Sequence, residues 1–415
     1  MNKRVLKEKI NNYFKENTPF VRTDILRILA EMVAQKTVNV PTSKLPDFDY
    51  LTIRGEEWKV AEIVKREFDN WGIPYQVFEK TNGRPNVVGK IGKNIASDKK
   101  LFMACHMDIV PPGSGWDTDP FVMTERDGKI YGRGVLDNKG PLASSMIAGK
   151  IMKDIIGDDA IQGELQISAL ADEEASDPDG EDYGIHYLMQ ENHIDPTYAI
   201  IPDIGENMHK IDIAEKGRLV INVKAKGKQA HGSTPHLGVN AINKMANFLA
   251  IFEKYTLLHE TDPILRHPSV NVGEIRGGAA ANIVPSECYC DIDIRIVPGQ
   301  TPESVRQEIK ALSMKVSDDF EVTLADGTLP HAINPDNLLV KSIQENARTY
   351  FDFTPEPFGL GGGTFAKGMN QHGILAVGFG PGDDTAFHMA NEFVDIEQLV
   401  TFTHLICLIA IDLTI

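Results

Sequence analysis

The sequence predicts an α/β fold with a mostly parallel sheet and a smaller α+β domain inserted into it. Strand and helix patterns alternate over residues 1 to about 210, change rhythm from 215 to 329, and resume afterwards. A chain of 415 residues is also long for a single hydrophobic core. We therefore predict a discontinuous first domain over 1–214 and 330–415, and an inserted domain over 215–329.

The first domain is expected to contain buried strands, because several apolar runs are bounded by turn residues. Helices are predicted over 54–70 and 141–156, where apolar residues recur at helical spacing and Gly157 ends the second helix. Strands are predicted over 85–91, 101–108, 163–170 and 198–203. Functional residues on such parallel sheets gather at the carboxyl ends of the strands.

The inserted domain follows a different order of elements. Strands are predicted over 218–227, 270–277, 282–297 and 320–326, and helices over 237–255 and 302–316. The order β-α-β-β-α-β is that of a ferredoxin-like split unit. A final strand, 374–381, then returns to the first domain and leads into the loop that carries His388.

Composition excludes some classes of partner. The formal net charge of −17 argues against nucleic acid and anionic membranes, which reward clustered Lys and Arg. The four cysteines form no C-x-x-C pair, which indicates a reducing compartment. The N-terminal segment lacks the apolar stretch of a signal peptide, and the C-terminal run LICLIAI is too short to span a bilayer. These features predict a soluble cytoplasmic protein.

Acidic and histidine side chains follow several of the predicted strands, and they are the residue types that bind divalent metals. Three carboxylates and two imidazoles can hold two ions, and further carboxylates can serve as the base and as an orienter. The candidates are His106, Asp108, Asp137, Glu173, Glu174, Asp203 and His388. Together they predict a two-metal hydrolase of amide bonds, although Asp137 alone could be an N-cap and adjacent acids are usually solvated.

Spacing assigns different tasks to neighbouring candidates. His106 and Asp108 lie two residues apart at a strand end, so they face the same side, and a carboxylate there can orient a metal-binding imidazole. Glu173 and Glu174 are adjacent and point in opposite directions. One can therefore bind metal while the other handles protons.

The ordered motifs between about residues 80 and 400 resemble one known family. They are H-x-D-x-x-P, W-x-x-D-P-F, Y-G-R-G-x-x-D-x-K-G-P, D-E-E, A-H-G-S-x-P, G-G-x-x-x-N-I-V-P and a late His. This series resembles the co-catalytic zinc exopeptidases, which include carnosinase-type dipeptidases, aminoacylases and desuccinylases of the diaminopimelate pathway. The resemblance implies a zinc-exopeptidase-like catalytic domain with an inserted lid and dimerisation domain.

The resemblance also implies roles for the metal-site candidates. Asp137 would bridge two Zn ions, with Mn or Co as other possible metals. His106 and Asp203 would complete one metal site, and Glu174 and His388 the other. Glu173 would be the general base and Asp108 the orienter of His106, and the Asp137–Asn138 peptide would be cis.

Further residues match substrate-binding positions of the family. His231 matches a histidine that reaches the scissile carbonyl, often from the partner subunit, and without the resemblance it would equally be a surface turn residue. Asn282 and Arg295 match substrate-binding residues, and an Arg suits a carboxylate. The loop 359–368 would line the substrate pocket through backbone N–H groups, at Gly362, Gly363 and Thr364.

These features predict hydrolysis of dipeptides or short peptides, because the family's peptidases have Asp at the position of Asp203. Two features depart from that pattern: Asn138 stands where those dipeptidases usually have Asp, and the segment after Glu174 is acidic. The alternative is hydrolysis of N-acyl amino acids with the same metals. A non-catalytic binding protein would require a missing ligand or base, and none is missing. The inserted domain has room for one split unit, so a homodimer formed through it is expected.

Overall fold

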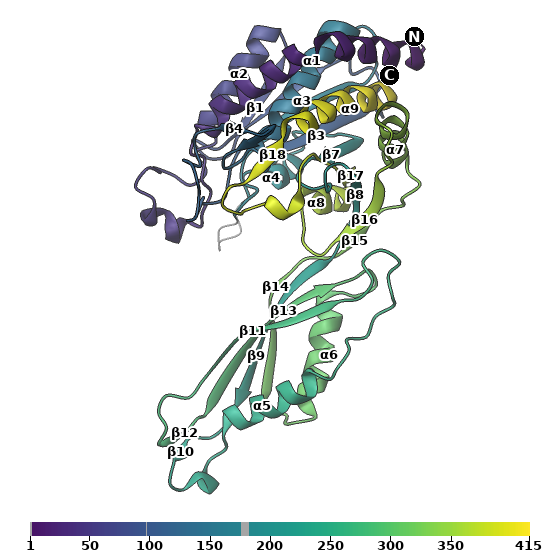
Figure 1. Cartoon of the computed structure of the whole chain (residues 1–415). Coiled ribbons are helices and arrows are strands. Elements are labelled where there is room, and N and C mark those ends of the chain that lie inside the picture. The colour runs from purple at the N-terminus through teal and green to yellow at the C-terminus, as the bar shows by residue number, and fades with distance from the viewer. Residues whose placement is uncertain (1, 97, 176–181) are drawn as a thin grey trace. The chain divides into compact units, whose positions relative to one another are not determined.

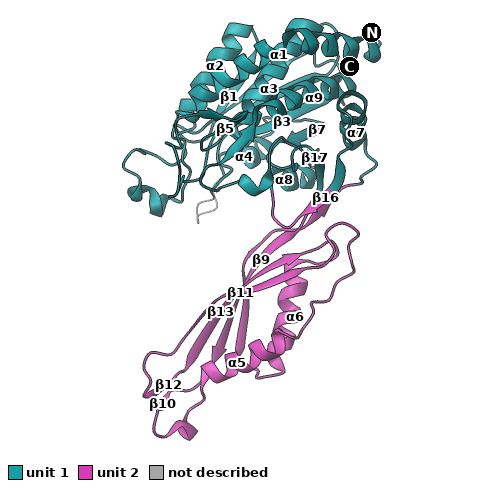
Figure 2. Ribbon diagram, in the orientation of Figure 1, with its two compact units in different colours: residues 1–213, 334–357, 364–415 teal, residues 214–333, 358–363 magenta. Residues whose placement is uncertain are grey.

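The computed structural model describes residues 2–96, 98–175 and 182–415, and it divides into two compact units (Figure 2). The first unit comprises residues 1–213, 334–357 and 364–415, and the second comprises 214–333 and 358–363. Segment 358–363 thus belongs to the second unit, whereas the sequence predicts it in the first domain. Most of the acidic segment after Glu174 lies outside the described residues.

The first unit is built on a mixed sheet with the strand order β1-β2-β6-β3-β7-β17-β8. The bounds are Tyr75–Glu79 for β1, Pro85–Ile91 for β2, Glu164–Leu170 for β6, Lys100–His106 for β3, Tyr198–Ile201 for β7, Leu375–Gly378 for β17 and Lys210–Glu215 for β8. The four central strands β6, β3, β7 and β17 are parallel, whereas β1, β2 and β8 pair antiparallel with their neighbours. The predicted α/β class is therefore confirmed.

Helices cover both faces of this sheet. On one face α3 (Lys139–Ile151) and α9 (Ile396–Thr414) contact β3, and α1 (Lys3–Val33) packs against both helices (Figure 1). On the other face α4 (Ile185–Gln190) and α8 (Phe365–Gln371) pack on Phe102 and Ala104 of β3. Because both faces are covered, β3 is buried along its whole length and reads as a continuous apolar run.

The C-terminal helix corrects one expectation. The run LICLIAI belongs to α9, which has 19 residues and is the one helix in the described chain long and apolar enough to cross a membrane. Within its most apolar window 78% of the residues are buried inside the structure. The expectation that this run is too short to span a bilayer is therefore wrong, but burial against α1, α3 and α7 is typical of a core helix.

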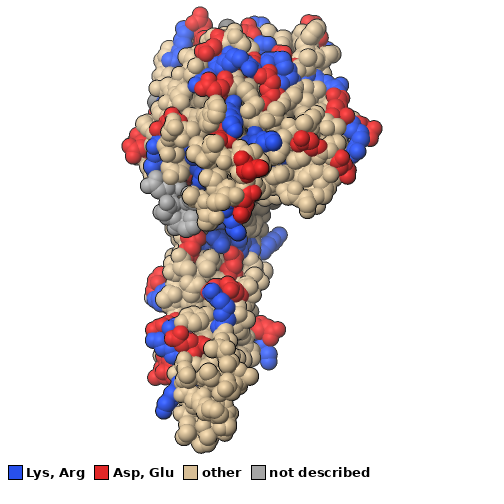
Figure 3. All heavy atoms as spheres, turned by 90° about the vertical axis from the view of Figure 1, so that its left-hand side faces the viewer, with Lys and Arg blue, Asp and Glu red and all other residues tan. Residues whose placement is uncertain are grey.

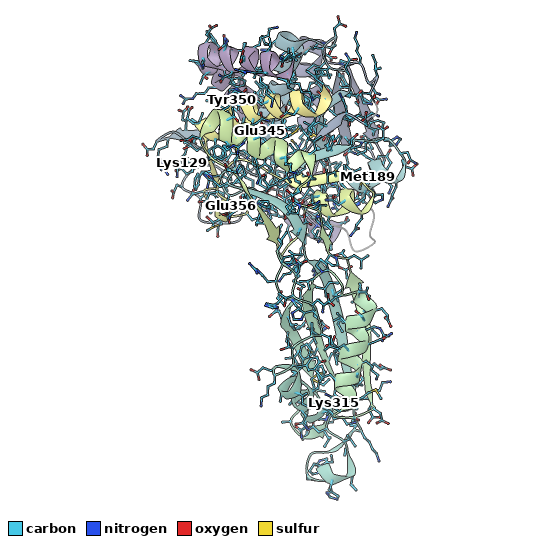
Figure 4. The ribbon with its side chains drawn as sticks, turned by 90° about the vertical axis from the view of Figure 1, so that its right-hand side faces the viewer. Lys129, Met189, Lys315, Glu345, Tyr350 and Glu356 are labelled. Atoms are coloured by element: carbon cyan, nitrogen blue, oxygen red, sulfur yellow. The ribbon has the colours of Figure 1, made fainter. Side chains whose placement is uncertain are left out.

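Helix α7 (Leu338–Phe351) is attached to helix α9 by polar contacts. Its Ser342 and Asn346 donate hydrogen bonds to the Asp412 carboxylate of α9, at 2.8 Å each. Glu345 lies on the exposed side of the same helix (Figure 4). The polar contacts and the apolar stripe of α7 therefore share one face, as in an amphipathic surface helix.

The second unit contains the predicted split β-α-β-β-α-β arrangement. Its elements are β9 (Gly217–Lys226), α5 (Ala241–Phe252), β11 (Ser269–Gly277), β13 (Glu287–Ile296), α6 (Pro302–Met314) and β14 (Phe320–Gly327). They form an antiparallel sheet in the order β11-β13-β9-β14. Alternate residues of β9 and β13 pack with α5 and α6 in one hydrophobic core, so the ferredoxin-like prediction is confirmed.

Two predicted elements of this unit have different bounds. The strand expected over 282–297 is divided into β12 (Ile283–Val284) and β13, because Pro285 between them has no N–H to donate to a ladder. The helix expected over 237–255 begins only at Ala241. The Asn240 side chain accepts a hydrogen bond from the Asn243 N–H and caps the helix there.

Apart from the helix α2, the remaining elements are short. They are α2 (Trp58–Trp71), a π-helical turn (Met152–Ile156), the 3-10 turns η1 (Thr42–Asp47), η3 (Pro235–Leu237) and η4 (Asp384–Ala386), and the strands β4 (Thr124–Arg126), β5 (Lys129–Tyr131), β10 (Ala230–His231), β15 (His331–Ala332), β16 (Glu356–Leu360) and β18 (Phe393–Asp395). On the face shown in Figure 3, Lys and Arg alternate with Asp and Glu and form no large basic area.

Candidate active site

The predicted metal ligands of the first unit lie at one edge of the sheet. His106 is the last residue of β3, Glu173 and Glu174 follow β6, and Asp203 follows β7. These strands are parallel neighbours, so their carboxyl ends meet. The turn before α3 adds Asp137, and the Asp137–Asn138 peptide is cis, as the resemblance implied.

Asp137 lies between the two histidines. Its Oδ1 is 3.0 Å from His106 Nε2, and its Oδ2 is 3.1 Å from His388 Nε2. Ligand atoms of His106, Asp137 and Glu174 all lie within 4.8 Å of one another. One carboxylate thus presents an oxygen to each of two imidazoles, which is the arrangement of a bridging ligand.

Each imidazole is accompanied by one further carboxylate. Asp203 Oδ1 is 3.9 Å from His106 Nε2, and Glu174 Oε2 is 3.1 Å from His388 Nε2. Asn138 donates a hydrogen bond to the same Asp203 oxygen at 2.5 Å. The structure therefore brings all five predicted metal ligands together, in two groups that share Asp137.

Asp108 contacts His106 differently from the expectation. The nearest acceptor to His106 Nδ1 is the Asp108 carbonyl oxygen at 3.0 Å, and the carboxylate lies at 3.4 Å. The carboxylate instead accepts the backbone N–H groups of Glu173 and Glu174, at 3.0 and 2.9 Å. With Nδ1–H donating to a carbonyl, Nε2 keeps its lone pair for a metal. Asp108 thus contacts both the histidine and the glutamate pair.

The charges at this edge are unbalanced. Burial raises the pKa of Glu174 and of Asp203 well above their usual values, and the negative charge of Asp137 adds to both effects. Burial likewise raises the pKa of Glu173 to about 7. Hydrogen bonds to Asp137 and Glu174 raise the pKa of His388 to about 10. Buried carboxylates of this density favour a bound cation.

The residues fit a pair of divalent ions. In the described chain, Glu174 Oε1 and Asp203 Oδ2 are buried and have no hydrogen-bond partner, so each has an oxygen free to ligate. His106 Nε2 and Asp137 Oδ1 face each other at 3.0 Å, and two such electron-pair donors require a proton or a metal ion between them. Oxygen and imidazole ligands without thiolate suit Zn, Mn or Co.

Residues that sequence reasoning missed hold the Asp108 carboxylate. Asn39 Nδ2 donates to Asp108 Oδ2 at 2.8 Å, and Arg54 Nε donates to Asn39 Oδ1 at 3.0 Å. Arg54 and Arg84 both pair with Asp172, at 2.8 and 3.0 Å. All five side chains are buried. Buried charged residues beside the candidate site would have identified these side chains. Burial, however, cannot be read from a single sequence.

The predicted substrate residues of the second unit fall into two groups. His231 in β10 pairs with Ile283 in β12, and the Asn282 carbonyl accepts the Gly232 N–H at 2.7 Å. Arg295 near the end of β13 lies beside the loop of Gly362 and Gly363, with Nη1 3.4 Å from the Gly361 carbonyl. Thr364 belongs to the first unit, where its hydroxyl caps α8. His231 and Asn282 belong to a separate two-stranded sheet, β10-β12, which adjoins the Glu287 end of β13, whereas Arg295 lies near the other end of β13.

The chain resembles known proteins over most of its length. Residues 213–321 match the family described as the M20 peptidase dimerisation domain. A probable succinyl-diaminopimelate desuccinylase from Staphylococcus epidermidis is 28% identical over 91% of this chain and 95% of its own. The succinyl-diaminopimelate desuccinylase of Nautilia profundicola is 30% identical over 74% of this chain and 83% of its own.

Solved structures share the fold. Aminopeptidase PepT from Bacillus cereus superimposes with a TM-score of 0.73 and 20% identity, over 94% of this chain and 98% of its own. With the ligand geometry, the matched domain and a relative at 30% identity, the chain belongs to the M20 family of metal-dependent hydrolases of amide bonds.

Proposed function

We propose that the protein hydrolyses the amide bond of dipeptides or short peptides with two divalent ions. The observation that carries the proposal is the position of Asp137, within 3.1 Å of both His106 and His388. His106, Asp203 and Asp137 would hold one ion, and Glu174, His388 and Asp137 the other. When bound, such ions polarise the substrate carbonyl and lower the pKa of water.

The chain's own residues would supply the proton chemistry. Glu173 would take the proton of the attacking water and return it to the leaving amine. Burial raises its pKa to about 7, which matches a base to neutral conditions. Zinc is the first candidate for both ions, with Mn or Co as alternatives, because the ligands are oxygen and nitrogen only.

A peptide substrate is supported by Asp203. The family's peptidases have Asp at this position, and here its carboxylate lies 3.9 Å from His106 with its Oδ2 unpaired among the described residues. A second candidate, hydrolysis of N-acyl amino acids, is supported by the relatives named as desuccinylases. The two substrates differ at one end: a peptide presents a free amine and an acyl amino acid does not.

A substrate panel separates these candidates. We expect the metal-loaded protein to hydrolyse dipeptides with free amines faster than the matching N-acetyl and N-succinyl amino acids, by at least tenfold in kcat/KM. Faster hydrolysis of the acylated compounds would favour the second candidate. Hydrolysis of neither class, with two metals bound, would reject the proposed function.

We propose that the active protein is a homodimer in which His231 acts in the partner's site. The two-stranded sheet β10-β12, with His231 and Asn282, adjoins the Glu287 end of β13, and Arg295 lies near the other end of that strand. The intervening strand runs from Arg218 to Lys226, roughly 26 Å at about 3.3 Å per residue. A dipeptide spans only roughly 7 Å. Both groups can therefore touch one substrate only if they come from different chains, whatever the arrangement of the two units.

An apolar surface on the second unit supports such a dimer. The edge strand β11 is exposed along its whole length, and it presents Val270, Val272 and Ile275 to solvent. A cavity of about 480 Å³ lies between β11 and α5, lined in part by Leu249 and Phe252. Exposed apolar edge strands pair readily with a second chain. The matched family is also described as a dimerisation domain.

Subunit complementation tests the trans role of His231. We expect His231→Ala to lower kcat by about 10²–10³, since a lost oxyanion donor typically costs ~3–4 kcal/mol. Mixing His231→Ala with Glu173→Gln chains should restore activity, because each hybrid dimer then has one intact site. A mixture that stays inactive after subunit exchange is demonstrated would reject the trans role, and so would an active monomer in sedimentation.

A cytoplasmic location is proposed from the cysteines. Cys105, Cys288, Cys290 and Cys407 are all buried and free of disulfides. Free thiols throughout are usual in a reducing compartment.

A further inference from the structure

Arg133 and Glu392 form a buried ion pair beside the candidate metal ligands. Arg133 Nη1 is 2.5 Å from Glu392 Oε2, and the two side chains are 1% and 0% exposed. A buried ion pair costs desolvation energy that a hydrophobic pair of similar volume would avoid. The other hydrogen bonds of Arg133 and Glu392 therefore indicate which segments the ion pair holds in place.

Glu392 binds the backbone of the turn that carries Asp137. Its Oε1 accepts N–H groups from Gly134, Leu136 and Asp137, at 3.0, 2.9 and 3.2 Å. This turn has no regular secondary structure to fix it before α3 begins. The carboxylate supplies the acceptors that a strand neighbour would otherwise provide.

Arg133 binds the backbone of the loop that carries His388. Its Nη2 lies 3.3 Å from the carbonyl oxygens of both His388 and Met389, and 3.4 Å from that of Pro112. The Arg133 guanidinium also lies 5.3 Å from the centre of the Trp116 ring. A single guanidinium thus joins Glu392 to the His388 loop. It can do so because an arginine side chain carries several N–H donors in one plane.

The position of His388 needs an external support of this kind more than the position of His106 does. The His106 side chain is fully buried at the end of β3, whereas 54% of the His388 side chain is exposed. His388 also has a backbone φ of +60°, in the left-handed region that is unfavourable for residues other than glycine. Packing therefore does little to hold the His388 ring, and its backbone needs an external support.

We propose that Arg133 is a positioning residue for one of the two metal sites, the one formed by Glu174, His388 and Asp137. This inference rests on the two-metal assignment proposed above. A replacement of Arg133 that lacks Nη2 should weaken binding of the ion at His388. Binding of the ion at His106 and Asp203 should be almost unaffected. Arg133 does not touch the reacting atoms, and a variant that keeps the positive charge opposite Glu392 should act through the His388 loop.

The test is a titration of the metal-free protein with Co²⁺, followed by visible absorption and equilibrium dialysis. Arg133→Lys keeps the charge opposite Glu392 but cannot also reach the His388 and Met389 carbonyls. We expect the wild type to bind two Co²⁺ ions per chain. In Arg133→Lys one binding step should weaken about 10–100-fold, as for other partners of metal ligands, and the other should change less than about twofold. Excess Co²⁺ should restore kcat.

The matched control is Lys7→Met, which removes a partly buried ion pair with Asp412 between α1 and α9. It should lower the melting temperature without changing either binding step. Glu392→Gln is a second variant, which keeps an acceptor for the backbone of the Asp137 turn but removes the charge that pairs with Arg133. If Arg133 then moves, binding of the ion at His388 should weaken in this variant too. Equal weakening of both steps in Arg133→Lys, or no weakening at all, would overturn the inference alone. A wild type that binds fewer than two ions would overturn the two-metal assignment as well.

Discussion

Removal of divalent metal is expected to reduce hydrolysis by at least about 10³-fold, since polarisation by a bound ion is worth several kcal/mol. The physical reason lies in the charges at the sheet edge, where Asp137, Glu174 and Asp203 converge on two imidazoles. Without a cation, burial raises the pKa of Glu174 and of Asp203, so these carboxylates take up protons instead. The measurement is turnover before and after exhaustive chelation, with metal content determined in both samples.

The same experiment has an independent readout. A ligand that binds only the folded state stabilises it, so the metal-free protein should melt at a lower temperature. Adding Zn²⁺ back should restore both turnover and melting temperature, and Mg²⁺, which prefers octahedral oxygen ligands, serves as the control ion. Undiminished activity in a sample shown to be metal-free would contradict the assignment.

Replacing Glu173 by Gln is expected to lower kcat by about 10²–10⁴, the usual loss on removing a general base. Gln keeps the size and the backbone hydrogen bond to Asp108 but cannot accept and return a proton. Metal content should stay at two ions per chain, because Glu173 is assigned no metal. The measurements are steady-state kinetics at saturating substrate and metal analysis of the same sample.

Glu174→Gln is the matched control, because it makes the same chemical change in the adjacent residue. That variant should lose affinity for the ion at His388, since Glu174 Oε2 lies 3.1 Å from His388 Nε2. If Glu173→Gln lost an ion and Glu174→Gln kept both, the roles of the two glutamates would be exchanged.

The sequence alone predicted the alternation of strands and helices around the site and the candidate metal ligands. Apolar runs ending in His106, in the Glu173–Glu174 pair and in Asp203 mark buried strands whose carboxyl ends carry polar residues. In a parallel sheet those ends must meet, so the proximity of these side chains follows from local pattern and topology. The β-α-β-β-α-β order of the second unit was readable for the same reason, because each element has its own hydrophobic period.

Tertiary structure decided what holds these residues. The support of Asp108 by Asn39 and of His388 by Arg133 joins segments separated by 69 and 255 residues, and no local pattern links them. The same applies to the separation of His231 from Arg295, which depends on strand register. Long-range hydrogen bonds and register form only after the strands pair, so a single sequence indicates candidate ligands but not the contacts that position them.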